Sequence, residues 1–279
     1  MKLYSVNTGF FKLDGGAMFS VVPKSIWNRT NPADQNNMIS LAMRALLIED
    51  GNRLILIDNG IGNKQDDNFL RFYFLHGDDS LDKSLKKYGF ERSDITDVII
   101  SHLHFDHCGG SVKWKDDRSG FEPTFKNAAY WSNKKQWDWA LSPNRREKAS
   151  FLSENIVPVQ ESGQLKFVEE NQEIIPGISL MFSFGHTEGM MHPVIRYNDK
   201  TVVYVSDMIP TSGHLPVPYV MSYDVRPLVT MAEKEKFLKH AAENDFILFF
   251  EHDPVTECCT LQITEKGVRL RERFLTSEI

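Results

Sequence analysis

The sequence of 279 residues is poor in cysteine and lacks any long apolar segment. It has three cysteines, Cys108 and the adjacent pair Cys258 and Cys259, and this sparse, odd number excludes a disulfide framework. The apolar stretch 246–250 is far too short to span a bilayer, so we expect no membrane partner. The N-terminal residues lack the layout of a signal peptide. Together, these absences predict a soluble, cytoplasmic protein.

The sequence also lacks an excess of positive charge. It has 32 Lys and Arg against 38 Asp and Glu, for a net charge of −6, and it has no run of five basic residues. Because binding to a phosphate backbone depends on dense Lys and Arg contacts, we expect no nucleic acid partner. The hydrophobic fraction of 41% and the charged fraction of 25% are typical of a globular protein, which excludes a disordered or fibrous chain.

Apolar runs alternate with stretches of helical periodicity, which predicts a layered α/β protein. We expect one domain over residues 1–279, because single α/β domains reach this length. Strands are expected at 39–49, 53–57, 97–101, 128–131, 177–184, 200–206 and 246–250, with a final hairpin of 261–264 and 268–271. Helices are expected at 80–88 and 133–141, and after a capping box formed by Thr230 and Glu233. Trp131, Trp137 and Trp139 are expected to pack beneath a loop, or alternatively to line a substrate cleft.

A cluster of metal-binding residue types follows the predicted strand 97–101. The segment 102–107 reads His-Leu-His-Phe-Asp-His. Imidazole nitrogen and carboxylate oxygen are natural ligands of zinc and related divalent metals. In an extended segment His102 and His104 project to the same side, and Asp106 and His107 follow after a turn.

Three residues further along the chain extend this pattern. His186, Asp207 and His252 each follow an apolar strand. Any one of them alone would be an ordinary polar residue at a strand end. Because α/β folds place their sites in loops at strand ends, we expect these residues to join the histidine cluster at one sheet edge.

This order of residues resembles the metallo-β-lactamase superfamily. The resemblance implies an α/β fold, an αββα sandwich of the metallo-β-lactamase type with two mixed sheets flanked by helices. It also implies two Zn²⁺ or other divalent ions per chain. By the same resemblance, His102, His104 and His186 would hold the first metal, Asp106, His107 and His252 the second, and Asp207 would bridge both. Asp58 would orient a ligand histidine, although it could also be a simple turn residue.

The implied chemistry is hydrolysis. A bound Zn²⁺ lowers the pKa of its water to about 7, and Asp106 could then transfer a proton as a general acid or base. The commonest zinc β-lactamases have cysteine where this chain has Asp207, and oxygen-reducing di-iron relatives have glutamate where it has His104. These differences favour hydrolysis of esters, lactones, thioesters or phosphoesters.

The N-terminal segment 11–24 is similar to the N-acyl homoserine lactonase branch, which implies a small acyl lactone or ester as substrate. Met18, Phe19, Trp27 and Tyr223 are candidates to line its pocket, although apolar residues in such a run also serve as core. Known lactonases have a tyrosine shortly after the bridging aspartate, and this chain does not. His214, Tyr219 or Tyr223 could take that catalytic position, and His214 could also be an ordinary loop histidine.

Several alternatives remain open at this point. A phosphotriesterase, a phosphodiesterase or another ester hydrolase would use the same two-metal site. A non-catalytic metal-binding protein on this fold is a third reading. A homodimer is an alternative to a monomer.

Overall fold

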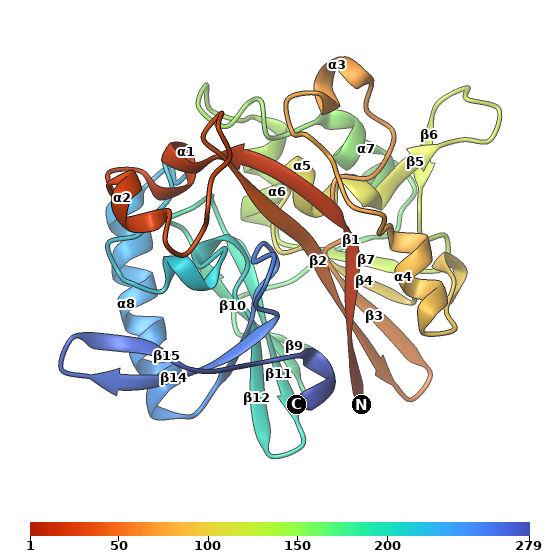
Figure 1. The fold of residues 1–279 in the computed structure, drawn as a ribbon. Coiled ribbons are helices and arrows are strands. Elements are labelled where there is room, and N and C mark those ends of the chain that lie inside the picture. The colour runs from red at the N-terminus through yellow and green to blue at the C-terminus, as the bar shows by residue number, and fades with distance from the viewer. The chain divides into compact units, whose positions relative to one another are not determined.

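The computed structural model describes residues 1–279 (Figure 1). The chain divides into two compact units. The first unit comprises residues 1–10 and 43–169, and the second comprises 11–42 and 170–279. Two long strands, β1 (Lys2–Asp14) and β2 (Met38–Asp50), run from one unit into the other. The prediction of one domain over residues 1–279 stays a prediction.

A mixed sheet with the strand order β1-β2-β3-β4-β7-β8 forms the framework of the first unit. Strand β2 pairs antiparallel with β3, and the remaining neighbours from β3 to β8 pair in parallel. These strands are β3 (Arg53–Ile57), β4 (Asp97–Ile99), β7 (Ala129–Ser132) and β8 (Leu165–Phe167). A separate small hairpin joins β5 (Val112–Trp114) to β6 (Phe121–Pro123).

Three helices supply apolar side chains to the core of the first unit. They are α4 (Leu81–Lys87), α6 (Lys134–Leu141) and α7 (Ser153–Glu161). Leu85, Trp137 and Val159 of these helices are buried in the same cluster as Leu56 and Val98 of the strands. Burying each such side chain stabilises the fold by about 1.5–3 kcal/mol, which holds the helices on the sheet. Two further helices in this unit, α3 (Asp67–Leu70) and α5 (Phe105–Cys108), are single turns.

The second unit has its own mixed sheet, in the order β15-β14-β13-β12-β11-β10-β9. Its strands are β9 (Glu173–Ile175), β10 (Ile178–Ser183), β11 (Met190–Tyr197), β12 (Lys200–Tyr204), β13 (Ile247–Phe249), β14 (Cys258–Thr264) and β15 (Gly267–Phe274). Only β12 and β13 pair in parallel. A parallel pair needs a long crossover, and helix α8 (Pro227–Glu243) lies within it. The short helices α1 (Gly15–Phe19) and α2 (Lys24–Trp27) also belong to this unit.

The α/β fold class, with two mixed sheets and flanking helices, is confirmed. The hairpin at residues 50–52 is present, because Asp50 pairs with Arg53 and Gly51 has a φ of +60°. The expected helix after Ser80 is also present, and the Ser80 side chain accepts a hydrogen bond from the backbone N–H of Lys83. Strands β1 and β11 and helix α7 were not expected from the sequence.

The prediction of a capping box formed by Thr230 and Glu233 is wrong. Helix α8 begins at Pro227, so Thr230 lies inside its first turn. Proline is favoured at the first helical position because its fixed φ suits the helix and no N–H is lost. Glu233 instead accepts hydrogen bonds from the backbone N–H groups of Phe184 and Gly185, just before His186.

No helix of this chain has both the length and the apolar character needed to cross a bilayer.

Helix α8 also carries a fully buried lysine. The ammonium of Lys234 donates hydrogen bonds to the carbonyls of His214, Pro216 and Tyr219, at 3.0, 3.2 and 2.7 Å. Burial lowers the pKa of Lys234 from 10.5 to about 7, because the charged form is poorly solvated in the core. The side chain thus fixes the loop 214–219 to α8 at an electrostatic cost.

This cost predicts a pH dependence of stability. Between pH 7 and 10 the unfolded chain binds a proton at Lys234 more readily than the folded chain, so the free energy of unfolding should rise with pH. The contribution of one proton is at most about 1.4 kcal/mol per pH unit. Urea unfolding at several pH values should show this slope in the wild type and lose it in Lys234→Met. The exposed neighbour Lys236→Met is the control, and equal slopes in all three proteins would contradict the assignment.

Candidate functional site

The segment after β4 contributes four buried metal-binding side chains to the first unit. His102, His104, Asp106 and His107 have exposed fractions of 0, 6, 8 and 0%. Asp106 and His107 lie in helix α5, and His104 is the residue that caps its start. The chain turns into this helix directly after the strand, so the four side chains gather within a few residues of the sheet edge.

His102 and His104 point ring nitrogens at each other, with His102 Nε2 3.0 Å from His104 Nδ1. Their other nitrogens have oxygen partners: His102 Nδ1 lies 3.1 Å from Ser101 Oγ, and His104 Nε2 lies 3.4 Å from Glu147 Oε1. The Ser101 hydroxyl donates its hydrogen to Asp58, so it accepts one from His102. The carboxylate of Glu147 can only accept. When both rings are neutral, they are therefore protonated on these outer nitrogens, and two lone pairs face each other.

Asp58 supports this group from a strained position at the end of β3, where its φ is +55°. Its carboxylate accepts the backbone N–H of Ser101 at 2.7 Å and the Ser101 hydroxyl at 2.6 Å. The same carboxylate lies 3.2 Å from His107 Nδ1, while His107 Nε2 faces Asp106 at 3.8 Å. Asp58 thus contacts His107 directly and His102 through Ser101, which is the geometry that orients ligand histidines.

The second unit holds a matching group at the ends of its strands. His186 follows β10, His252 follows β13, and Asp207 lies in a 3₁₀ turn after β12 that begins with Ser206 at a φ of +42°. The two oxygens of Asp207 lie 3.2 Å from the Nε2 atoms of His186 and His252, one oxygen for each ring. A single carboxylate therefore contacts both histidines.

The outer nitrogens of these rings are also engaged. His186 Nδ1 donates to Asp224 at 2.9 Å, and His252 Nδ1 donates to the carbonyl of Ala42 at 2.7 Å. Because both partners can only accept, a neutral ring presents its Nε2 lone pair to the Asp207 carboxylate, as a metal-binding histidine does. Lone pair against carboxylate is repulsive unless positive charge lies between them.

The same proton distribution holds in both units, and it fits divalent metal ions. Each histidine is protonated on its outer nitrogen and presents a lone pair to another lone pair or to a carboxylate. Cations relieve that repulsion, and the nitrogen and oxygen donors suit zinc and similar metals. Hydrogen bonds on the outer nitrogens are the usual support of metal-binding histidines.

Three of the supporting residues carried no predicted role. Asp224 directly follows Tyr223, and nothing in the sequence connects it with His186. Ser101 and Glu147 had no signal of their own, because a single serine or glutamate is common in any sequence.

His214, a predicted catalytic residue, is fully buried, and both of its ring nitrogens have partners. Nε2 donates to the carbonyl of Met18 at 2.9 Å, so Nδ1 accepts from the Thr211 hydroxyl at 2.8 Å. Burial lowers the pKa of His214 to about 3, which keeps the ring neutral. This geometry favours a structural role over contact with substrate.

The predicted pocket residues Met18, Phe19 and Trp27 are buried, with exposed fractions of 1, 0 and 2%. The ring of Phe19 stacks on His214 at 4.1 Å and on Trp27 at 5.4 Å. A substrate could reach these side chains only by displacing the stack, so the geometry favours a packing role for all three. Tyr223 is 38% exposed and remains accessible.

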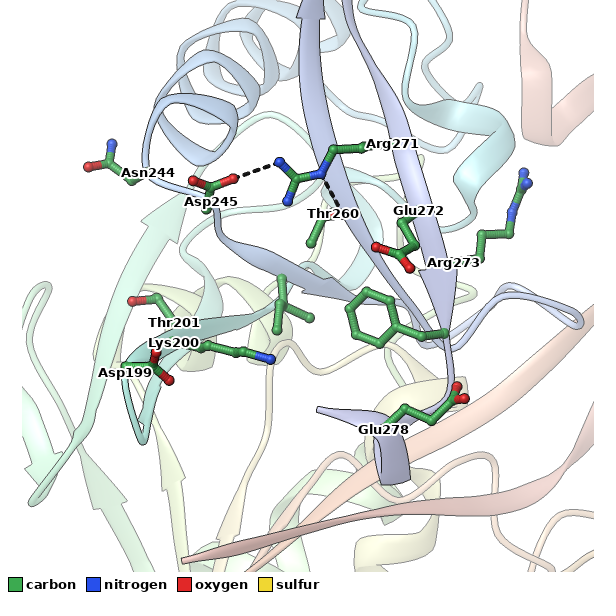
Figure 2. Close-up of a pocket in the computed structure, with 12 residues that line it drawn as sticks. Asp199, Lys200, Thr201, Asn244, Asp245, Thr260, Arg271, Glu272, Arg273 and Glu278 are labelled. Atoms are coloured by element: carbon green, nitrogen blue, oxygen red, sulfur yellow. Dashed lines mark hydrogen bonds and ion pairs between the residues drawn. The ribbon is translucent and has the colours of Figure 1, made fainter.

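A cavity of about 520 Å³ lies elsewhere in the second unit (Figure 2). Its lining includes Lys200 at the start of β12, and Asp245 just before β13, whose carboxylate pairs with Arg271 at 2.8 Å. Asp207 and His252 follow the opposite ends of these two strands. The cavity is therefore separate from the metal-binding side chains.

Comparisons with known proteins identify the family. Residues 44–252 match the metallo-beta-lactamase superfamily. The chain belongs to this superfamily. The family resemblance inferred from the sequence is confirmed, and the protein is a metal-dependent hydrolase.

Several relatives of the superfamily cover nearly the whole chain. N-acyl homoserine lactonase AiiA of Bacillus thuringiensis subsp. kurstaki is 24% identical over 273 residues, covering 90% of this chain and 93% of AiiA. The structure of a probable metal-dependent hydrolase from Staphylococcus aureus has a TM-score of 0.88 at 29% identity and covers 98% of both chains. The dizinc quorum-quenching lactonase AidC, in complex with a product, has a TM-score of 0.78 at 23% identity over 98% of this chain and 95% of AidC.

The role of Asp58 can be tested through metal affinity. Asp58→Asn removes the carboxylate that accepts from both Ser101 and His107, so we expect metal affinity to fall about 10–100-fold. Competition with a chromophoric chelator measures this change. Asp245→Asn, which removes an exposed carboxylate paired with Arg271, is the matched control. Wild-type affinity in Asp58→Asn would show that the residue is only part of a turn.

Proposed function

We propose that this protein is a dinuclear metal hydrolase that opens the lactone ring of N-acyl homoserine lactones. The proposal includes one catalytic domain over residues 1–279. His102, His104 and His186 would hold one Zn²⁺ or similar ion, and Asp106, His107 and His252 a second. Asp207 would bridge the two.

The observation that carries the two-metal proposal is the position of Asp207. Each of its oxygens faces the Nε2 lone pair of a different histidine at 3.2 Å. A carboxylate that served one ion would need only one such partner. The relatedness to lactonases over 90% of the chain supports a lactone as the substrate.

The proposed reaction needs no serine or cysteine nucleophile. When bound, divalent ions supply Lewis acidity and a water that ionises near neutral pH. Asp106, which is 8% exposed and faces His107, would accept a proton and return it to the leaving alcohol. Cys108 is completely buried, so its thiol cannot reach a substrate.

Aromatic side chains beside Asp106 offer an apolar surface for an acyl chain. The ring of Phe105 lies 5.3 Å from Phe69 and 4.6 Å from Tyr73. Burial and the charge of Asp106 raise the pKa of Tyr73 to about 12, so its hydroxyl stays protonated and can donate a hydrogen bond. We propose these residues as a substrate-contacting surface, and Tyr223 stays a separate proposed pocket residue.

The substrate class is tested by comparing turnover of N-hexanoyl homoserine lactone with that of an aryl phosphotriester, using zinc-loaded protein. We expect a higher kcat/KM for the lactone. Faster phosphotriester turnover would favour the phosphoesterase alternative. Two bound zinc equivalents without any ester, lactone or phosphoester turnover would favour a non-catalytic protein.

The site assignment is tested by Asp207→Ala and His104→Ala. Each removes a proposed metal-binding atom, so lactone hydrolysis should fall by at least about 10³-fold, whereas circular dichroism should remain native-like. Thr201→Ala, at the far end of β12, is the control. Activity within twofold of the wild type in either site variant would refute the assignment.

A further inference from the structure

His104 differs from the other four histidines proposed to bind metal in which ring nitrogen faces the proposed metal site. His102, His107, His186 and His252 are bonded through Nδ1 to their supporting oxygens and present Nε2. His104 presents Nδ1, and its Nε2 faces Glu147. The orientation of this one ring therefore depends on an acceptor placed on its far side.

Glu147 is buried, with an exposed fraction of 3%, and its two oxygens are used differently. One oxygen accepts from the indole N–H of Trp139 at 2.7 Å and from the side-chain amide of Asn144 at 2.5 Å. The other oxygen lies 3.4 Å from His104 Nε2. A buried carboxylate is tolerated only with such donors, and these two hold Glu147 in the orientation that reaches His104.

The segment 142–152, which joins α6 to α7, supports His104 in other ways as well. The ring of Phe151 lies 4.8 Å from the His104 ring. The carbonyl of Ser150 accepts the backbone N–H of Phe105, the residue after His104, at 3.0 Å. The backbone N–H of Ser150 in turn donates to the carbonyl of Glu147 at 2.7 Å. Ring orientation and backbone position of His104 are thus both controlled from this segment.

We propose that Glu147 is the positioning residue of His104. By accepting the Nε2 proton, it holds the tautomer in which the Nδ1 lone pair faces His102, and so it determines how tightly the ion shared by these two histidines is bound. Trp139 acts indirectly, because its indole N–H donates a hydrogen bond that holds the Glu147 carboxylate. The inference rests on the proposed metal site and adds that one of its two positions depends on the segment 142–152.

The test variant is Glu147→Gln, which keeps the size of the side chain. The amide has one acceptor oxygen, so it cannot serve both His104 and the pair of donors from Trp139 and Asn144. Chelator competition should show a loss of about 10–100-fold for one metal equivalent, with the other unchanged. The metal-free protein gives a second readout, because ¹⁵N NMR of histidine should show His104 protonated on Nε2 in the wild type and a changed tautomer population in the variant.

Two further variants sharpen the test. Glu154→Gln, in the first turn of α7, removes a carboxylate that contacts Gln65 and should behave as the wild type. Trp139→Phe keeps the glutamate but removes one of its donors, so a smaller loss at the same metal equivalent is expected. This variant also serves if Glu147→Gln fails to fold.

The outcomes separate this inference from the proposed function. Unchanged affinity for both equivalents, with an unchanged His104 signal, would overturn the role of Glu147. An equal loss of both equivalents, together with a lower melting temperature of the metal-free protein, would show a merely structural role and also overturn it. Failure of the wild type to bind metal would refute the proposed function, and the NMR readout would still test the tautomer.

Discussion

The hydrogen bonds on the outer nitrogens of the histidines are the constraint on which the rest of the site depends. Each one places a proton on the side of the ring that faces the protein and leaves a lone pair on the other side. The acceptors are chemically diverse: a hydroxyl, three carboxylates and a backbone carbonyl. None of them can be replaced by a donor without reversing the ring or its protonation. The metal-binding character of the protein is therefore set by residues that need not touch a metal.

The scaffold pays for this arrangement with local strain at the strand ends. Asp58 and Ser206 are non-glycine residues at positive φ; Asp58 contacts Ser101 and His107, and Ser206 directly precedes Asp207. Such conformations are unfavourable by about 1–3 kcal/mol each and persist only where surrounding structure enforces them. In both cases a strand whose last three residues are apolar and buried leads into the strained turn. Rigid strands thus position the polar side chains that follow them.

A second buried polar network in this protein has a different purpose. Lys234 binds three carbonyls of the loop 214–219, and His214 binds the carbonyl of Met18 and stacks on Phe19. Every donor in this network meets a protein acceptor, so no lone pair is left facing another. The contrast with His186 and His252 explains why one buried histidine is structural whereas others suit a metal: the difference lies in the partner of the second nitrogen.

The sequence by itself determined the fold class, the family and the metal-binding residue types, because apolar strands followed by histidine and aspartate are local patterns. The family resemblance also implied that Asp58 orients a ligand histidine, and its carboxylate lies 3.2 Å from His107 Nδ1. The sequence left the roles of Met18, Phe19 and Trp27 open, since an apolar residue in a short run looks the same in a core as in a pocket. Only the tertiary structure revealed Glu147 and Asp224 as partners of His104 and His186, each separated by about 40 positions in the chain. Such a hydrogen bond depends on which loops lie next to each other in the folded chain. Neither the periodicity nor the composition of the sequence indicates this.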